Sequence, residues 1–251
     1  MTVAFLVFAN LWLFTRLVCL FRDEAAGGRI WAGKALVELA VLAAAYSCHA
    51  AWWGAAISVG VLNFIGHRLE QGRGRKDLAR LVIGLAGLAA WSIWFSPRLG
   101  LEFRPGWQQW FDGLEKWSTL GALPRAAGTM GFQLKLFGLL LSANEANLVI
   151  RAVFDRLDLK PRSPAGGGIA AVDVGEFNRG RVIGLLERVL LYGFVLQGQY
   201  GAIGFVLAAK AFTRFKALDD RPFAEYVLIG TLLSACLALM IGGIVTWLLR
   251  A

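Results

Sequence analysis

Long apolar runs separated by short polar segments dominate the pattern of hydrophobic and polar positions along the chain. The runs cover residues 3–21, 35–50, 52–66, 81–97, 126–142, 180–198, 200–217 and 224–249. A helix needs about 20 predominantly apolar residues to cross the hydrocarbon core of a bilayer, and most of the runs approach this length. The pattern therefore predicts an all-α fold, a polytopic transmembrane bundle of about seven spans.

The number of spans depends on residues 35–66, an apolar run of 32 residues interrupted by Trp52-Trp53-Gly54. Because one spanning helix needs only about 20 residues, we expect a tight hairpin of two short helices that break at this tripeptide. If the run is a single span instead, the count becomes six and the N-terminus lies on the other side of the membrane.

Residues 106–120 are too polar to span a bilayer and have the pattern of an amphipathic helix. Trp107, Trp110 and Trp117 fall on one face, while charged and amide side chains occupy the other. A helix with tryptophans on its apolar face typically lies in the plane of the lipid headgroups. We therefore predict an interfacial helix; the alternative is a small soluble cap packed on the bundle.

The segment at residues 158–178 has the composition of a linker, with two prolines and three consecutive glycines. It follows a helical extension of the fifth run. We therefore expect three parts: an N-terminal membrane half at 1–142, a cytoplasmic extension with its linker at 143–178, and a C-terminal three-helix membrane unit at 179–251.

The composition agrees with a membrane protein. Hydrophobic residues make up 57% of the chain and charged residues 17%, whereas soluble domains carry about 25% charged residues. The three cysteines lie far apart within apolar segments and do not indicate a disulfide framework. The net charge of +9 is spread over several loops without a nucleic-acid-binding motif, so we expect no nucleic-acid partner.

Basic residues are concentrated in the polar segments 67–80, 151–181 and 214–221, and the shorter segment 22–34 is basic as well. Cytoplasmic loops of membrane proteins carry an excess of lysine and arginine. Placing these segments in the cytoplasm puts both termini outside and brings eight of the ten tryptophans to or near the outer face. Because the two signals agree, we expect this orientation, with the lipid bilayer as partner of the apolar surface.

Charged residues within the last three predicted spans form matched pairs. Glu187 and Lys210 each lie seven residues from the cytoplasmic end of their span, roughly 10 Å from that interface. A charge without a partner in lipid costs on the order of 3 kcal/mol, which favours an ion pair between them. Arg214 and Glu225 predict a second pair nearer the surface, and Arg188 is expected to snorkel to the cytoplasmic side.

These charges have two interpretations. They form either a static clamp that holds the three helices in register or part of a proton or ion relay, because ionisable residues inside membranes often mark pathways. A pairing partner for each charge favours the clamp. Lys135, in the middle of the span at 126–142, has no evident partner nearby, and together with Glu38 of the second span it defines a possible polar cavity.

Small residues at four-residue spacing mark two helix-packing faces, because they allow a neighbouring backbone to approach closely. One face contains Gly180 and Gly184 and continues to Glu187. Each face is expected to contact another helix, either of this chain or of a partner. The second face is a ladder in the last span, made of Gly230, Ser234, Ala238 and Gly242.

Four segments within residues 147–243 carry a family resemblance: NLVIR, GRVIGLLERVLL, GQYGAIGFVLAAKAFTRF and AEYVLIGTLLS. They contain the patterns G-R-x-I-G-x-L-E-R, A-A-K-x-x-x-R-F and E-Y-x-L-I-G-T-L-L-S. The C-terminal half thereby resembles an uncharacterised bacterial multi-pass membrane family, a domain of unknown function. The resemblance implies a bacterial cytoplasmic (inner) membrane location and a structured three-helix unit, but no activity.

In that family the N-terminal half carries His and Asp motifs that resemble a metal-binding constellation, and this chain departs from them. Asn10 and Phe14 stand at the positions of one His and Asp, and Asn63 and His67 at those of a second pair. A third motif keeps only Asp77. Because a metal site needs three or more converging ligands, we expect no metal and no cofactor.

No nucleophile elbow, P-loop, HExxH or CxxC motif occurs in the chain, so the sequence gives no support for an enzyme. The leading hypothesis is a non-enzymatic subunit or scaffold that packs against other membrane subunits or a second copy of itself. The alternatives are a small ion- or proton-coupled transporter or channel and a membrane-permeabilising effector. An enzyme acting on lipid-linked substrates ranks last.

Overall fold

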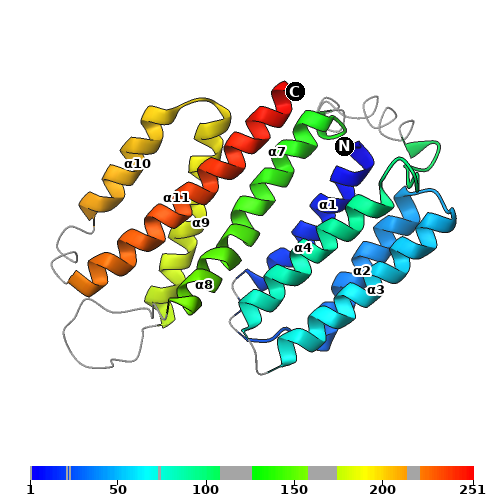
Figure 1. Ribbon diagram of the computed structural model, residues 1–251, viewed down its shortest axis with the longest axis horizontal. Helices are drawn as coiled ribbons and strands as arrows, with labels where there is room; N and C mark the ends of the chain where they lie inside the picture. The colour runs from blue at the N-terminus through cyan, green and yellow to red at the C-terminus, as the bar shows by residue number, and fades with distance from the viewer. Residues whose placement is uncertain are drawn as a thin grey trace. The chain divides into compact units, whose positions relative to one another are not determined.

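The computed structural model describes residues 2–20, 22, 24–72, 75–107, 126–157, 174–213 and 221–251. Their regular structure is helical apart from one isolated backbone bridge, which confirms the predicted all-α class. The chain divides into two compact units, Met1–Leu140 (unit 1) and Leu141–Ala251 (unit 2). Figure 1 shows the helices that make up each unit.

Unit 1 is built around its first helix. Its elements are α1 (Val3–Arg16), a 3-10 turn (Leu17–Cys19), α2 (Gly28–Ala45), α3 (Ala50–Gln71), α4 (Lys76–Trp94) and α7 (Met130–Leu140). Thr2 caps α1, since its hydroxyl accepts a hydrogen bond from the Phe5 N–H at 3.2 Å. α1 packs against α2, α4 and α7, and α3 packs against α2 and α4. The core of unit 1 therefore lies along α1, where Phe8 and Trp12 are fully buried.

Residues 35–66 are divided between two helices as predicted, but the break lies at residues 46–49 and the predicted position at Trp52-Trp53-Gly54 is wrong. The backbone at the end of α2 bonds to a segment that follows α4. Ser47 N–H donates to the Glu102 carbonyl at 3.0 Å, and Arg104 N–H donates to the Ala45 carbonyl at 2.8 Å. A segment distant in the sequence therefore determines where α2 ends.

Three glycines of unit 1 each pack against the indole ring of a tryptophan from another helix. An added Cβ atom would meet Trp94 at Gly54 (2.1 Å), Trp31 at Gly66 (2.5 Å) and Trp12 at Gly87 (2.3 Å). No larger residue fits at these positions without moving an indole ring. Gly54, at which the sequence predicted a helix break, is thus a packing position inside α3.

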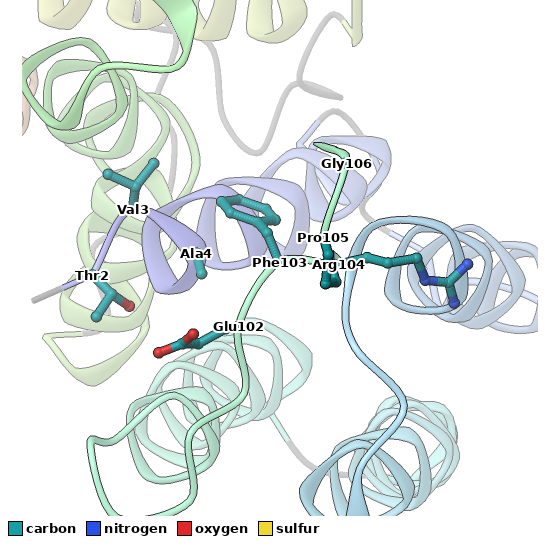
Figure 2. A pocket seen from close by; sticks show the side chains of 8 residues that line it. All are labelled: Thr2, Val3, Ala4, Glu102, Phe103, Arg104, Pro105 and Gly106. Carbon is teal, nitrogen blue, oxygen red and sulfur yellow. The ribbon is translucent and has the colours of Figure 1, made fainter. Parts of the chain in front are cut away.

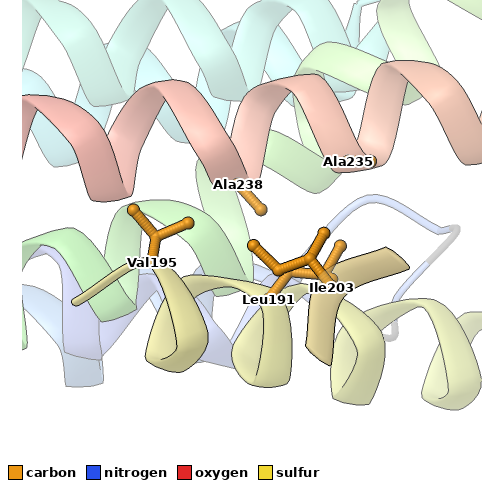
Figure 3. Packing of buried hydrophobic residues seen from close by; sticks show 5 residues of the cluster. All are labelled: Leu191, Val195, Ile203, Ala235 and Ala238. Atoms are coloured by element: carbon orange, nitrogen blue, oxygen red, sulfur yellow. The ribbon is translucent and has the colours of Figure 1, made fainter. Parts of the chain in front are cut away.

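Unit 2 is organised around the long helix α11. Its elements are a π-helical turn (Leu141–Glu145), α8 (Ala146–Arg156), α9 (Val174–Leu196), α10 (Tyr200–Thr213) and α11 (Arg221–Arg250). α11 packs along α9 and against α8, so residues assigned from the sequence to a cytoplasmic extension form part of this unit. Figure 3 shows its apolar core, where Leu191 and Val195 of α9 meet Ile203 of α10 and Ala235 and Ala238 of α11.

Within the described part of the chain, three helices are long and apolar enough to cross a membrane: Lys76–Trp94, Met130–Arg156 and Ala224–Arg250. Val3–Cys19 and Tyr200–Thr213 are apolar but shorter. These helices are compatible with a membrane protein, while the predicted count of about seven spans is not confirmed.

The predicted interfacial helix at 106–120 lies almost entirely outside the described residues, and Trp110 and Trp117 are among those not described. Trp107 is described, and its ring stacks on that of Phe103 with a centroid distance of 6.3 Å. Most of the predicted linker, residues 158–173, also lies outside the described residues. Both elements stay predictions.

Candidate functional site

A buried ion pair lies at the centre of unit 1. Lys34 and Glu38 are one helical turn apart on α2, and the Lys34 Nζ atom lies 2.7 Å from the Glu38 Oε1 atom. Nζ also donates to Asn63 Oδ1 on α3 at 3.0 Å and lies 3.5 Å from the ring centroid of Trp12 on α1. The ammonium is therefore held by a carboxylate, an amide oxygen and an aromatic face from three helices.

The Glu38 carboxylate, which is fully buried, is satisfied on both oxygens. Oε1 accepts a hydrogen bond from Thr15 Oγ1 at 2.6 Å, and Oε2 accepts one from Asn63 Nδ2 at 2.8 Å. We call these residues (Trp12, Thr15, Lys34, Glu38 and Asn63) the α2 charge cluster. Because its charges are paired and hydrogen-bonded across α1, α2 and α3, it fixes the positions of these helices.

The contacts of the α2 charge cluster contradict the predicted polar cavity of Lys135 and Glu38. Glu38 pairs with Lys34, whereas Lys135 is an exposed residue of α7. The spacing of four residues between Lys34 and Glu38 was the signal in the sequence. The apolar pattern hides this signal, because Lys34 falls in the polar segment 22–34, although α2 begins at Gly28.

A second buried ion pair joins the facing ends of α3 and α4. Arg80 Nε lies 2.6 Å from Glu70 Oε1, and the two side chains are 2% and 1% exposed. Arg80 also donates to the Arg22 carbonyl at 2.6 Å and to the Glu24 carbonyl at 2.9 Å, while Glu70 Oε2 accepts from the Ala26 N–H at 2.8 Å. We call Glu70 and Arg80 the α3–α4 charge cluster; it ties the segment after α1 to the α3–α4 turn.

Where the structure describes them, the positions singled out by the family resemblance make separate contacts. Asn10 of α1 bonds to Gln133 of α7, with Nδ2 2.6 Å from Oε1, and Asn63 belongs to the α2 charge cluster. Phe14 is 63% exposed, and Asp77 lies 3.6 Å from Arg80. Among the described residues, no group of three or more His, Cys, Asp or Glu side chains is placed to hold a metal ion.

In unit 2 the structure brings Glu187 and Lys210 into direct contact, as their matched depth predicted. The pair joins α9 to α10, and its side chains are 14% and 17% exposed. Arg214, the predicted partner of Glu225, lies outside the described residues, so that second pair stays a prediction.

Arg188 does not snorkel to the surface, and the prediction that it does is wrong. Its side chain is 3% exposed and turns toward the π-helical turn and α11. Nε donates to the Ser142 carbonyl at 3.1 Å, and the terminal nitrogens lie 3.4 Å from Ser234 Oγ and Asn147 Oδ1. The π turn changes the helical hydrogen-bond pattern at the Ser142 carbonyl that Arg188 contacts.

The ladder of small residues on α11 is a packing face within this chain. An added Cβ atom at Gly242 would lie 2.7 Å from Val195 of α9, and one at Gly230 would lie 3.0 Å from Phe154 of α8. Ser234 contacts Arg188, and Ala238 is fully buried in the core of unit 2. Helices α8 and α9 therefore occupy this face.

The other predicted packing face, at Gly180 and Gly184 of α9, is different. No described atom lies within 4 Å of a Cβ atom added at Gly180, and at Gly184 only Arg188 does, at 3.8 Å. The predicted close helix contact at these glycines is therefore absent among the described residues of this chain.

A depression of about 370 Å³ lies in unit 1 beside the start of α1 (Figure 2). Residues 2–4 and 102–106 line it, and Glu102 and Arg104 are its charged members. The Arg104 side chain donates to the Ala43 carbonyl at 2.9 Å. The functional side chains of this lining are one carboxylate, one guanidinium and the Thr2 hydroxyl, which do not make an acid–base pair or an activated nucleophile.

No protein-family model, curated protein sequence or solved structure matches this chain. The resemblance of residues 147–243 to an uncharacterised membrane family therefore stays a prediction.

Proposed function

We propose that the chain is a polytopic protein of the bacterial cytoplasmic membrane and acts as a non-enzymatic subunit or scaffold of a membrane assembly. The observation that carries this proposal is the distribution of side chains. Charged groups are buried inside the units, where Lys34–Glu38 and Glu70–Arg80 form ion pairs, while large apolar side chains are exposed on the outside of the helices. Soluble proteins rarely expose contiguous apolar surface of this kind.

The exposed apolar side chains follow helical stripes. On α3 they are Ile57, Val61 and Phe64, which are 64%, 47% and 59% exposed. Further members on α9, α10 and α11 include Leu186, Leu190, Phe205, Phe212, Leu228, Leu232, Met240, Ile244 and Trp247. Lipid chains are the natural environment of such stripes, because they cover apolar surface without specific partners.

The proposed topology follows from the basic segments. Segments 22–34, 67–80, 151–181 and 214–221 lie in the cytoplasm, and both termini lie outside. Because an odd number of crossings puts the termini on opposite sides, this orientation requires an even number. The proposal therefore has eight crossings, one for each apolar run, rather than seven.

The role of a scaffold is supported by the state of the buried charges. The α2 and α3–α4 charge clusters bond to helices and loops on every side, which is typical of structural clamps. The open glycine face of α9 at Gly180 and Gly184 has the spacing that admits another helix, of a partner subunit or of a second copy.

A small ion-coupled transporter is the second candidate, and Arg188 favours it. This buried cation contacts only neutral oxygens among the described residues, and the nearby Ser142 Oγ atom is buried without a hydrogen-bond partner. Buried polar groups that are incompletely satisfied are typical of sites that bind or move a ligand.

Membrane fractionation followed by native mass spectrometry tests the proposal. The chain should stay with the membrane after an alkaline carbonate wash, and gentle detergent should release it with other subunits at fixed stoichiometry. Release by carbonate alone would contradict membrane embedding. A monomer without partners would contradict the scaffold, and flux measurements with an Arg188→Met variant would then test the transporter.

The topology has its own test, because Cys48 is exposed in the connection between α2 and α3. A variant with Cys19→Ser and Cys236→Ser retains Cys48 as its single thiol. A membrane-impermeant maleimide should label this variant from the periplasmic side of intact cells whose outer membrane has been permeabilised. Labelling only after lysis would reverse the proposed orientation.

A further inference from the structure

We propose that the α2–α3 pair of unit 1 binds the headgroup of an anionic phospholipid between Arg29 and Arg68. This inference rests on the proposed membrane embedding and goes beyond it, because it assigns a lipid class and a binding position. Three observations support it: two apolar stripes that end in arginines, the register of the two helices, and the orientation of the Glu70 carboxylate away from Arg68.

Each helix of the pair carries an exposed apolar stripe that ends in an arginine. On α3, exposed Ile57, Val61, Phe64 and Ile65 lead to exposed Arg68. On α2, exposed Leu36 and Val37, which are 67% and 49% exposed, lie two turns after exposed Arg29. Spacings of three, four, seven and eight residues place each arginine on the same helical face as its stripe.

The register of the helices brings the two arginines to the same end of the pair. α2 and α3 run antiparallel, and a Cβ atom at Gly28 would lie 3.5 Å from the His67 ring. Arg29 and Arg68 each follow one of these contacting residues. Each residue of a helix is rotated by about 100° from the residue before it. Because α2 and α3 run in opposite directions, this rotation takes the residue after the contact to the same side of the pair on both helices. Arg29 and Arg68 are both exposed, so their side chains lie on the outer surface at this end of the pair.

The charge of this position is not cancelled from within α3. Glu70, the acidic residue nearest to Arg68 in the sequence, points into the unit, where Arg80 and the Ala26 N–H bind its carboxylate. Arg68 instead extends over the exposed ring of Phe64, with Cζ 5.2 Å from the ring centroid. A guanidinium in this arrangement lies at the boundary between apolar and polar surface, at the level of a lipid phosphate.

The chemistry of an anionic phospholipid fits these features. Its phosphate accepts hydrogen bonds from two guanidinium groups, and its acyl chains cover the stripes at Leu36 and Phe64. The cytoplasmic leaflet is rich in anionic lipids, and the proposed topology places this end of α2 and α3 on that side. A zwitterionic lipid gains less binding free energy at this position, because its headgroup carries a compensating positive charge.

Native mass spectrometry of the full chain, released from membranes in mild detergent, tests the inference. The probes are phosphatidylglycerol and cardiolipin, compared with phosphatidylcholine, each added at the same concentration. Wild type should retain the anionic lipids preferentially. The double variant Arg29→Gln/Arg68→Gln should bind them more weakly by about fivefold per arginine, on the order of 25-fold in total.

A matched control is the double variant Arg98→Gln/Arg250→Gln, which removes two exposed arginines from other positions. It should retain the lipids as wild type does. Equal lipid loss in both variants, unchanged binding in the first variant, or displacement of the lipids by millimolar inorganic phosphate would each overturn the inference. If wild type stays in the membrane after carbonate but retains no anionic lipid, the inference fails while the proposed membrane location holds.

Discussion

The two units bury charge in different ways. In unit 1, Lys34, Glu38, Glu70 and Arg80 each have an oppositely charged partner within 2.7 Å and further hydrogen bonds. In unit 2, Arg188 is just as buried but contacts a carbonyl, a hydroxyl and an amide oxygen at 3.1–3.4 Å. The charged side chains are thus similarly buried in both units. Those named in unit 1 have oppositely charged partners, whereas the described partners of Arg188 in unit 2 are neutral and lie at longer distances.

This difference separates two roles of buried charge. A fully paired cluster loses much when one member is removed, because the remaining charge is left buried. A cation held by neutral oxygens leaves no buried charge behind when it is replaced. The first arrangement is therefore the one expected of a clamp, and the second is the one that leaves capacity for a ligand.

The largest expected effect is that of Lys34→Met, which strands the buried Glu38 carboxylate. The free energy of unfolding should fall by about 3–5 kcal/mol. Tryptophan fluorescence during denaturation in detergent measures it, because nine of the ten tryptophans lie in residues 1–140. The double variant Lys34→Met/Glu38→Leu should recover much of the loss. A single variant as stable as wild type would remove the basis for calling this cluster a clamp.

A smaller loss is expected from Gly87→Ala, because the new Cβ atom meets the Trp12 indole at 2.3 Å. Overpacking of this kind typically costs about 1–3 kcal/mol. The matched control is Gly184→Ala in unit 2, where space is open and alanine favours the helix by up to about 1 kcal/mol. Thermal unfolding of both variants, followed by circular dichroism, should shift in opposite directions.

Arg188→Met should change the free energy of unfolding by no more than about 1 kcal/mol, because the substitution strands no charge. The same denaturation in detergent, followed by circular dichroism, measures it. This variant tests directly whether the buried charges of the two units contribute differently to stability. A loss as large as that of Lys34→Met would show that Arg188 is a structural clamp too.

The weakest interaction is expected between Glu187 and Lys210, which are partly exposed. A double-mutant cycle with Glu187→Gln and Lys210→Met should give a coupling of about 0.6 kcal/mol, the average for polar contacts between membrane helices. A coupling above about 2 kcal/mol would show that this pair stabilises its unit as strongly as the charge clusters stabilise unit 1.

The sequence alone was sufficient to predict contacts that depend on the depth of a residue along its helix. Glu187 and Lys210 were paired from the rise per residue alone, and the ladder from Gly230 to Gly242 was identified from its spacing. Both features depend only on residue spacing within α9, α10 and α11, three helices that the apolar runs locate. The apolar pattern therefore gave their positions directly.

The sequence was insufficient where a distant segment decides the contact. The end of α2 depends on bonds to residues 102–104, and Arg188 turns toward a π turn that no apolar pattern marks. Lys34, Glu70 and Arg80 were assigned to polar loops because charged residues lower local hydrophobicity, although helices α2, α3 and α4 extend to include them. Hydrophobicity locates the apolar part of such helices. Their polar ends are helical because they pack against other segments, and the apolar pattern does not show this packing.

The four-residue spacing of Lys34 and Glu38 has a consequence for biosynthesis. A lysine alone at the centre of a nascent helix costs about 2.5–3.5 kcal/mol to insert, and an acidic residue costs a similar amount. Because both charges lie on one turn of α2, they can neutralise each other before the partner helix α3 has been made. In the proposed membrane topology, α2 can therefore leave the translocon as an electrically neutral segment, and Asn63 completes the contacts when α3 follows.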